Sequence, residues 1–396
     1  MATERSQSER FEDIDWDEVT SGWRFGLPPR SLGMVFGVAA LCGMFLYDLY
    51  VVSADETTFE AVGWGYDVTQ LDWLFALSLL FIGFYIVVPL YQNPRMTRYY
   101  WDNFKKNRPA LVSLVFLLGI FGIGVVGPLF ISKPELALFD QYQPPVYTSV
   151  DASYVIECGG RTVDGKCYGS WEDPLGTTGD GQSILKIVVY GMNLSMKLGF
   201  VIAMIIIVIG SVVGTVAAYS RPLVDEVLMR YVDVQQVFPA FLLYLLISYI
   251  FSRDIIWFVV VYGFLSWGGT ARYVRSNALQ KTEEEYIKSA KASGADTWHI
   301  IRRHLVPNTA SSIITQTTLL IPGVILAEAA FSFLGLGDPT LPSWGQAIAA
   351  GRDDLSFAWW IATIPGVFLF FTILAFNFLG DALLDAINPQ AESENE

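Results

Sequence analysis

Long apolar stretches recur along this 396-residue chain, and they constrain its fold more than any other feature. Each is close to the roughly 20 residues that a helix needs to cross the hydrocarbon core of a bilayer. The stretches are 33–52, 71–91, 110–131, 194–219, 228–251, 255–271, 309–336 and 357–380. Hydrophobic residues make up 53% of the chain and charged residues only 16%. The sequence therefore predicts an all-α, polytopic membrane protein with about eight transmembrane helices.

The charges between the apolar stretches predict how the chain is oriented, because Lys and Arg concentrate on the cytosolic side of membrane proteins. The linker 92–110 holds five bases against one acid, so we place it in the cytosol. The connector 53–70 holds four acids and no base, so we place it outside. Segment 272–303, with seven Lys or Arg residues, is then cytosolic as well. Eight spans put both termini in the cytosol, and we expect the protein in the cell membrane.

The same boundaries divide the chain into domains. These are an acidic cytosolic tail (1–31), an N-terminal transmembrane pair (32–91), a basic cytosolic linker (92–110), a core (111–384) and a second acidic cytosolic tail (385–396). Within the core, residues 132–183 are expected to form an external loop and residues 272–307 a cytosolic segment.

The net charge of −14 comes mostly from the tails and the outer loops. One interpretation is a salt-adapted organism, in which carboxylate-rich surfaces keep proteins soluble. The alternative is that the two acidic tails are simply disordered. Neither interpretation favours nucleic acid as a partner.

The cytosolic segment carries the most specific local pattern. Thr282 followed by Glu285 has the spacing of a capping box, so we expect a helix to begin there and to stop at Gly294. Asp296 or Thr297 can then cap a second short helix. The residues on one face of that helix, before Pro307, are Trp298, Ile301 and Leu305.

Two short helices bent at a glycine make a compact knob that suits insertion into a groove of a partner protein. The alternative is an amphipathic loop that lies on the lipid surface.

Two stretches of this segment resemble the coupling-loop signature of ABC-importer permeases. They read Tyr-Ile-Lys-Ser-Ala-Lys-Ala-Ser-Gly-Ala-Asp (286–296) and Arg-His-Leu-Val-Pro-Asn (303–308). The family pattern is Glu-Ala-Ala, three residues, Gly, nine residues and Ile-x-Leu-Pro. This chain keeps the spacing, with Lys288, Ser289, Ala290, Gly294, His304, Val306 and Pro307 at the pattern positions. Lys288 and His304 depart from the pattern, so a partner groove would carry an acid opposite Lys288.

Further stretches resemble the second membrane subunit of peptide/nickel importers. They are Leu-Ala-Glu-Ala-Ala-Phe-Ser-Phe-Leu-Gly-Leu-Gly-Asp-Pro (326–339), Pro-Ser-Trp-Gly (342–345), Asp-Pro-Leu-Gly-Thr (173–177), Arg-Tyr-Val-Asp-Val (230–234) and Asn-Phe-Leu-Gly-Asp-Ala-Leu-Leu-Asp-Ala-Ile-Asn-Pro (377–389). The likeness covers roughly residues 100–390. It implies a six-helix core of the type I importer permeases, to which the first two spans are an N-terminal addition.

The resemblance implies a transport subunit without an ATPase site of its own. Such a subunit would pair with a homologous permease, two cytosolic ATP-binding subunits and an external solute-binding protein. ATP and Mg would be bound by the ATPase subunits, and this chain would bind no cofactor directly. The residues that would dock on an ATPase are Thr282, Glu285, Tyr286, Lys288, Ser289, Ala290, Gly294, Ala295, Trp298 and Pro307. The family carries dipeptides, longer peptides, nickel complexes and sugars, so the transported solute stays open.

Ionisable groups and helix breakers inside the spans are candidates for the pathway. Glu328 lies in an apolar run, where a carboxyl group is costly unless it is paired or hydrated. It would serve either proton coupling or a structural hydrogen bond to a neighbouring helix. Pro239, Pro322 and Pro365 are expected to interrupt and bend their spans, either for gating or for packing alone.

No hydrolytic or metal-binding constellation emerges from the sequence. Cys158 and Cys167 flank a Gly-rich turn of the external loop and form either a disulfide or two free thiols. The run Gly160–Cys167 has the spacing of a phosphate loop, but Cys stands where Ser or Thr should bind Mg and the next residues cannot continue as a helix.

Two other classes of function remain open alongside an importer subunit. An ion-coupled secondary carrier would work without ATPase subunits and would need intramembrane charges, of which Glu328 is the clearest. A membrane scaffold would need no pathway at all, and the three prolines inside spans weigh against it.

Overall fold

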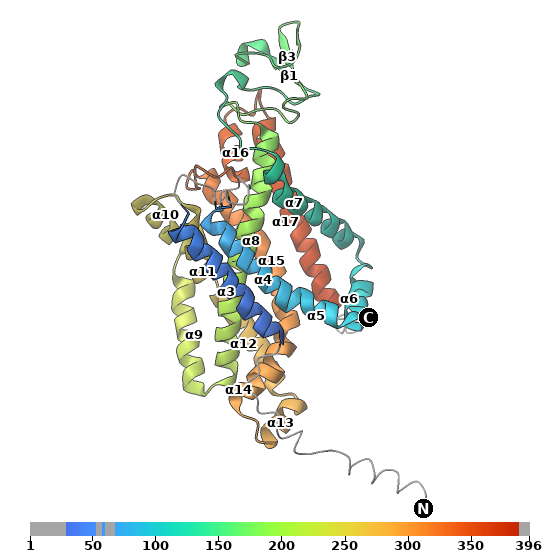
Figure 1. Ribbon diagram of the computed structural model, residues 1–396, viewed down its shortest axis with the longest axis vertical. Helices are drawn as coiled ribbons and strands as arrows, with labels where there is room; N and C mark the ends of the chain where they lie inside the picture. Colours follow the sequence, from blue (N-terminus) through green and yellow to red (C-terminus); the bar gives the residue numbers. More distant parts are fainter. Residues whose placement is uncertain (1–28, 53–57, 60–67, 388–396) are drawn as a thin grey trace, which may run out of the picture.

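A computed structural model describes residues 29–52, 58–59 and 68–387 (Figure 1). The predicted tails before residue 29 and after residue 387, and most of the connector 53–70, lie outside the described residues. The described residues form an elongated bundle of helices, with a small lobe containing the strands at one end and helices α13 and α14 at the other.

Helices dominate the structure, and most of them follow the apolar stretches. They are α3 (Pro29–Tyr50), α4 (Gln70–Ile82), a π-helical turn (Gly83–Val87), α5 (Val88–Gln92), α6 (Pro94–Phe104), α7 (Arg108–Phe130), α8 (Ile184–Tyr219), α9 (Pro222–Val237), α10 (Ala240–Ile250), α11 (Ile255–Leu265), α12 (Gly268–Thr282), α13 (Glu285–Ala292), α14 (Thr297–Ile300), a second π-helical turn (Ile301–Leu305), α15 (Val306–Phe333), α16 (Trp344–Gly351) and α17 (Trp360–Ile387).

The number of spans agrees with the sequence. In the described part of the chain, seven helices are long and apolar enough to cross a membrane, and α9 with α10 makes an eighth if this bent pair counts as one span. The bend of 64° falls at Pro239, as the proline predicts. The all-α polytopic fold with about eight spans is confirmed.

The predicted interruption is wrong at the other two prolines. Pro322 lies inside the unbroken helix α15 and Pro365 inside the unbroken helix α17. Each removes one backbone hydrogen bond, but α15 and α17 pack against each other, and such neighbours can keep a proline-containing membrane helix continuous.

Helix α8 is the centre of the bundle and contacts α4, α7, α11, α12, α15 and α17. Its closest neighbour is α12, because two glycines of α8 leave room for it. A Cβ atom at Gly210 would lie 2.8 Å from the side chain of Thr270, and one at Gly214 would lie 2.4 Å from the carbonyl oxygen of Ala271. Larger residues at these positions would push the two helices apart.

Residues 132–183 hold a three-stranded antiparallel sheet of order β1–β3–β2, and we call them the outer lobe after their predicted external position. The strands are β1 (Ser149–Asp151), β2 (Thr162–Val163) and β3 (Lys166–Tyr168). Asp164 and Gly165 have φ of 49° and 72°, which suits the tight turn between β2 and β3. The lobe is fastened to the bundle by Trp360 of α17, whose Nε1 donates to the carbonyl of Thr177 at 3.0 Å.

The N-terminal pair α3–α4 is joined to α8 by a buried ion pair. Lys197 Nζ of α8 lies 2.5 Å from Asp72 Oδ1 of α4, and the two side chains are only 9% and 13% exposed. Asp72 also closes a capping box with Thr69 at the start of α4. Asp48 of α3 accepts a hydrogen bond from Trp73 Nε1 of α4 at 3.0 Å, which links the two helices of the pair.

We expect the Asp72–Lys197 ion pair to decide whether the N-terminal pair stays on the core. Removing one partner of a buried pair leaves an uncompensated charge, so Asp72→Asn should lower the free energy of unfolding by about 3 kcal/mol. Asp72→Asn with Lys197→Met should recover most of that loss. Thermal unfolding of the purified protein measures both.

The matched control is Asp48→Asn, which changes a carboxylate of the same helix pair that has no basic partner in the described structure. It should cost about 1 kcal/mol, the ordinary value of one hydrogen bond. A double variant as unstable as Asp72→Asn alone would contradict the role given to the ion pair.

Candidate functional site

The segment predicted to dock on a partner lies at the end of the bundle opposite the outer lobe (Figure 1). We call residues 282–307 the docking segment. It follows α12 and contains α13, α14 and the second π-helical turn.

The start of α13 differs from the predicted capping box. Helix α12 runs on to Thr282, whose hydroxyl donates to the carbonyl of Leu279 at 2.7 Å instead of capping the next helix. Helix α13 begins at Glu285, and Glu284 is its N-cap residue without a side-chain cap bond. The prediction is wrong because Thr282 belongs to the end of the longer helix α12.

Gly294 ends α13 as its sequence position predicts. Its φ is +82°, a conformation that favours glycine. The amide of Gly294 donates to the carbonyl of Lys291 at 3.0 Å, and that of Ala295 donates to the carbonyl of Ala290 at 3.1 Å. These two bonds form a Schellman motif, which satisfies the last carbonyls of α13 and turns the chain.

The second helix of the docking segment is capped as predicted but does not end where predicted. Asp296 Oδ1 accepts a hydrogen bond from the amide of His299 at 3.0 Å, so Asp296 is the cap of α14. The chain then continues through the π-helical turn Ile301–Leu305 directly into α15. Pro307 does not stop the helix, because a proline is tolerated in the first turn of α15, after the change of hydrogen-bond register.

An apolar cluster holds the two helices of the docking segment together. Its buried members are Ile287, Ile300, Ile301 and Leu305, with Ala290 and Ala295 packed beside them. Tyr219, the last residue of α8, packs against the same cluster, and Lys291 Nζ lies 4.8 Å from the centre of its ring. The docking segment is therefore a rigid unit fixed to α8. The predicted contacts of the Trp298 and Pro307 side chains fall outside what the structure describes.

Most of the other predicted docking residues lie on the exposed side of α13. Glu285, Tyr286, Lys288, Ser289 and Gly294 are exposed. Lys288 pairs with Glu283 across 3.4 Å, but both side chains are largely in solvent and such pairs contribute little. This side of α13 is free to contact another protein.

Tyr286 sits at the edge of an aromatic group on the same surface. Its ring centre lies 6.1 Å from that of His304, which in turn lies 6.0 Å from that of His299. Burial raises the pKa of the Tyr286 hydroxyl, and the carboxylate of Glu284 adds to the rise. The hydroxyl is therefore a neutral hydrogen-bond donor at pH 7.

Two ion pairs tie α12, the helix before the docking segment, to α9. Arg275 binds Asp225 with two bonds, Nε to Oδ1 at 2.6 Å and Nη2 to Oδ2 at 2.5 Å. Arg272 pairs with Asp233 through Nη2 and Oδ1. These arginines are not among the residues predicted from the sequence, although their spacing of three residues on a helix puts both on one side.

Glu328 is buried between α15 and the start of α16, with 3% of its surface exposed. Its Oε1 accepts a hydrogen bond from Ser332 Oγ, one turn further along α15, at 2.7 Å. The two helices meet closely here, since a Cβ at Gly345 would lie 2.2 Å from the carbonyl oxygen of Ala329.

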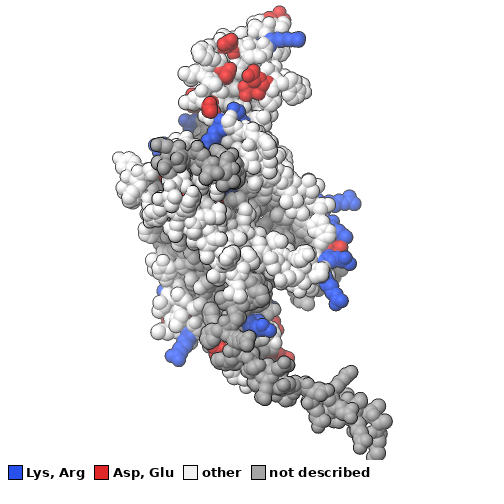
Figure 2. All heavy atoms as spheres, in the orientation of Figure 1, with Lys and Arg blue, Asp and Glu red and all other residues white. Residues whose placement is uncertain are grey.

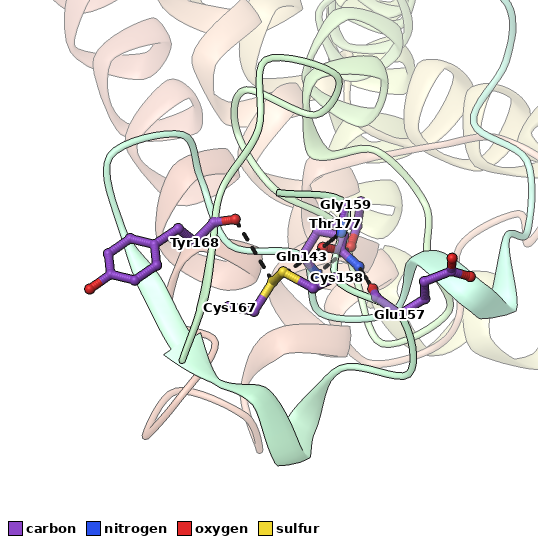
Figure 3. Close-up of a disulfide and its surroundings, with 7 residues drawn as sticks. All are labelled: Gln143, Glu157, Cys158, Gly159, Cys167, Tyr168 and Thr177. Atoms are coloured by element: carbon purple, nitrogen blue, oxygen red, sulfur yellow. Dashed lines mark hydrogen bonds between the residues drawn. A yellow bond between two sulfur atoms is a disulfide. The ribbon is translucent and has the colours of Figure 1, made fainter. Parts of the chain in front are cut away.

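The outer lobe is braced by a disulfide between Cys158 and Cys167, with sulfur atoms 2.04 Å apart (Figure 3). Gln143 lies beside it, where its Nε2 donates to the carbonyl of Glu157 at 2.5 Å and its Oε1 accepts from the amide of Gly159 at 3.0 Å. The run with phosphate-loop spacing, 160–167, forms the β2–β3 hairpin, and no helix follows it to receive a phosphate.

The tip of the outer lobe exposes aromatic side chains. Tyr147 is 86% and Trp171 73% exposed, and their ring centres lie 6.1 Å apart. Beside them a shallow hollow of about 490 Å³ is lined by Arg161, Tyr168 and Trp171, among others. Tryptophan, tyrosine and arginine are the residues that most often carry the binding energy of protein interfaces.

Among the described residues, no group of three or more His, Cys, Asp or Glu side chains is arranged to hold a metal ion. The predicted sites therefore separate into a docking segment at one end, Glu328 between α15 and α16, and the disulfide-braced lobe at the other end (Figure 1). Lys197 and Asp72 are not among the residues predicted from the sequence. A lysine inside the apolar run 194–219 was the signal that could have indicated Lys197, but not its partner.

Known proteins match most of this chain. Residues 206–393 match the family "Binding-protein-dependent transport system inner membrane component", and residues 95–145 match "N-terminal TM domain of oligopeptide transport permease C". These matches begin after the N-terminal pair α3–α4.

Three relatives are similar over nearly their whole length. The dipeptide transport system permease protein DppC of Bacillus subtilis is 34% identical over 295 residues, which is 73% of this chain and 84% of the relative. The glutathione transport system permease protein GsiD of Pectobacterium atrosepticum is 31% identical, covering 75% of this chain and 92% of the relative. The oligopeptide transport system permease protein OppC of Haemophilus influenzae is 28% identical, covering 72% and 86%. The chain belongs to the binding-protein-dependent transport system inner membrane components, the permease subunits of ABC importers.

Proposed function

We propose that this permease forms half of a pathway that imports peptides, with a homologous permease forming the other half. The relatives described above are permeases for dipeptides, oligopeptides and glutathione, which is itself a small peptide. Two cytosolic ATP-binding subunits would drive transport, and an external solute-binding protein would deliver the solute. The observation that carries the proposal is the rigid docking segment, which continues without a break into the membrane helix α15.

This continuity supplies a mechanism for coupling. When ATP closes the ATPase pair, a push on α13 and α14 would pass along α15 to Glu328 and α16 at the outer side. A second route would run from α12 through the Arg275–Asp225 and Arg272–Asp233 pairs to α9. The bend at Pro239 would then separate α9, which moves, from α10.

We assign ATP binding and hydrolysis to the partner subunits. On this proposal ATP and Mg stay on those subunits, and the permease binds no cofactor directly. The rigid docking segment supports the assignment, because a subunit driven from outside needs a surface that receives force and no nucleotide site of its own.

We also propose the orientation of the chain in the cell membrane. Both termini, α6 and the docking segment would lie in the cytosol, and the outer lobe would lie outside. The charges support this arrangement, because acidic residues gather on the outer lobe while Lys and Arg lie toward the other end (Figure 2). The Cys158–Cys167 disulfide also fits an oxidising external side.

The docking segment can be tested with Gly294→Asp. A Cβ atom at position 294 would have no neighbouring atom of this chain within 4 Å, so the variant should fold and insert into the membrane normally. A charged group placed in a helix-in-groove interface should cost more than about 2 kcal/mol, or roughly 30-fold in binding. We expect loss of co-purifying ATPase subunits and of labelled dipeptide uptake, measured by pull-down from gently solubilised membranes and by transport into vesicles.

The matched control is Gly165→Asp in the outer lobe. Gly165 has a φ of +72° and open space around its Cβ position, so the substitution adds the same strain and the same charge at the far end of the molecule. It should retain the ATPase subunits. If Gly294→Asp retained the ATPase subunits as well as Gly165→Asp does, the docking segment would not be the surface that binds them.

Variants of Glu328 distinguish an ATP-driven importer from an ion-coupled secondary carrier. On the present proposal its carboxyl group is a structural hydrogen-bond acceptor, so Glu328→Gln should keep near-normal uptake that still requires ATP. Glu328→Leu should instead lower the free energy of unfolding by about 1–3 kcal/mol, because the buried hydroxyl group of Ser332 loses its partner. ATP-independent uptake that Glu328→Gln abolishes would support the carrier and refute the importer.

The tip of the outer lobe should contact the solute-binding protein. Trp171→Ala should weaken binding of the purified solute-binding protein by about tenfold or more, because an exposed interface tryptophan commonly contributes over 1 kcal/mol. The control is Phe139→Ala, since Phe139 is 71% exposed and its neighbour Asp140 bonds to Thr177, the residue through which the lobe is fastened to α17. Surface plasmon resonance on nanodisc-embedded protein compares the two, and unchanged affinity in Trp171→Ala would exclude the tip from the interface.

A further inference from the structure

Helix α6 and the residues next to it form a basic and aromatic surface that the proposed transport function does not explain. It lies between the end of α5 and the start of α7, after a break in the helix at Asn93. Phe104 is buried against Ala110 of α7 and against Ala382 and Ala386 of α17, so α6 is fixed to the inner ends of two spans. Figure 1 shows α6 level with the ends of these spans, whereas the docking segment projects further.

The charge of this surface is strongly unbalanced. Its five bases are Arg95, Arg98, Lys105, Lys106 and Arg108, and all are exposed. Its one acid, Asp102, is paired with Lys105 at 2.7 Å. No other described acid forms an ion pair with these bases, including Asp381 and Asp385 on α17. Figure 2 shows the resulting cluster of Lys and Arg atoms over α6.

Aromatic side chains lie among these bases. Tyr91, Tyr99 and Trp101 are all exposed, Tyr91 to 87%. Water-exposed rings of this size are unfavourable, but tyrosine and tryptophan are enriched at the level of lipid headgroups, where the ring is partly buried and its polar edge stays wet. A short helix that combines such rings with unpaired bases at the cytosolic end of its spans matches the anionic cytosolic surface of a membrane.

We propose that α6 is a binding surface for anionic lipid headgroups of the cytosolic leaflet. The phosphates are held by Arg95, Arg98, Lys106 and Arg108, and the rings of Tyr99 and Trp101 lie in the interface. Because Phe104 joins α6 to α17, bound lipid fixes the inner end of α17 at the membrane surface. A water-soluble phosphate would not bind here, because exposed bases on a helix surface give no enclosed site.

The experiment titrates purified full-length protein in detergent with phosphatidylglycerol, with phosphatidylcholine and with inorganic phosphate, and native mass spectrometry counts the bound molecules. Wild type should retain phosphatidylglycerol in preference to phosphatidylcholine and should not retain phosphate. Arg95→Gln with Arg98→Gln should weaken phosphatidylglycerol retention by about 30-fold at low salt, since each base near an anionic surface contributes a factor of about five. The loss should shrink as salt is added.

The matched control is Arg221→Gln with Arg230→Gln, which removes two exposed bases from the neighbourhood of α9 and leaves α6 intact. It should bind phosphatidylglycerol like wild type. If both double variants lost phosphatidylglycerol equally, the effect would come from the net charge of the protein and not from α6, and the proposal would be overturned. Retention of inorganic phosphate in place of lipid would overturn it as well.

A second measurement tests the chain's own C-terminal acids as the occupant. Glu392→Gln, Glu394→Gln and Glu396→Gln together should leave phosphatidylglycerol retention unchanged. A several-fold rise would mean that these acids occupy α6 in the wild-type chain, and it would overturn the assignment of lipid as the occupant of α6. Neither measurement needs ATPase subunits or transport, so the outcome is independent of the proposed import of peptides.

Discussion

The absence of water in the hydrocarbon core is the constraint on which this structure depends, because a polar group buried there needs a partner within the protein. Lys197 meets this need with Asp72, and Glu328 meets it with the hydroxyl of Ser332. The first of these interactions also joins two helices. The buried ion pair therefore helps to determine which helices stay together, in addition to the apolar packing around α8.

Close packing also joins neighbouring elements into larger units. Close contact at Gly210 and Gly214 holds α12 to α8, and the apolar cluster around Ile287 holds the docking segment to the end of α8. The bent pair α9–α10 is the exception, because Pro239 ends the hydrogen-bond pattern there and the backbone on either side is free to take another angle. The break in the helical pattern of this pair thus lies at a position that the sequence marks.

Local patterns in the sequence predicted local structure well and long-range contacts poorly. The apolar stretches predicted the spans, Gly294 predicted the end of α13, and Asp296 predicted the cap of α14. Thr282 was misassigned because the same residue can cap one helix or end another, and the longer helix α12 decided the outcome. The Asp72–Lys197 pair joins residues far apart in the chain, so no local pattern could reveal that they meet. The π-helical turn before α15 could not be predicted either, because no particular residue pattern marks a change of hydrogen-bond register.

The unbroken path from α14 through the π-helical turn into α15 has a consequence for the size of the movements involved. From Thr297 to Phe333 the helix is a rod of about 55 Å, at about 1.5 Å per residue. Pivoted at one end, such a rod carries its other end about 5 Å sideways for a tilt of only about 5°. On the proposed orientation, a displacement of about one helical turn at the cytosolic end would therefore correspond to a tilt of only about 5° about a pivot at the outer end. The continuous helix would then transmit the movement of a partner into the bundle without a separate connecting element.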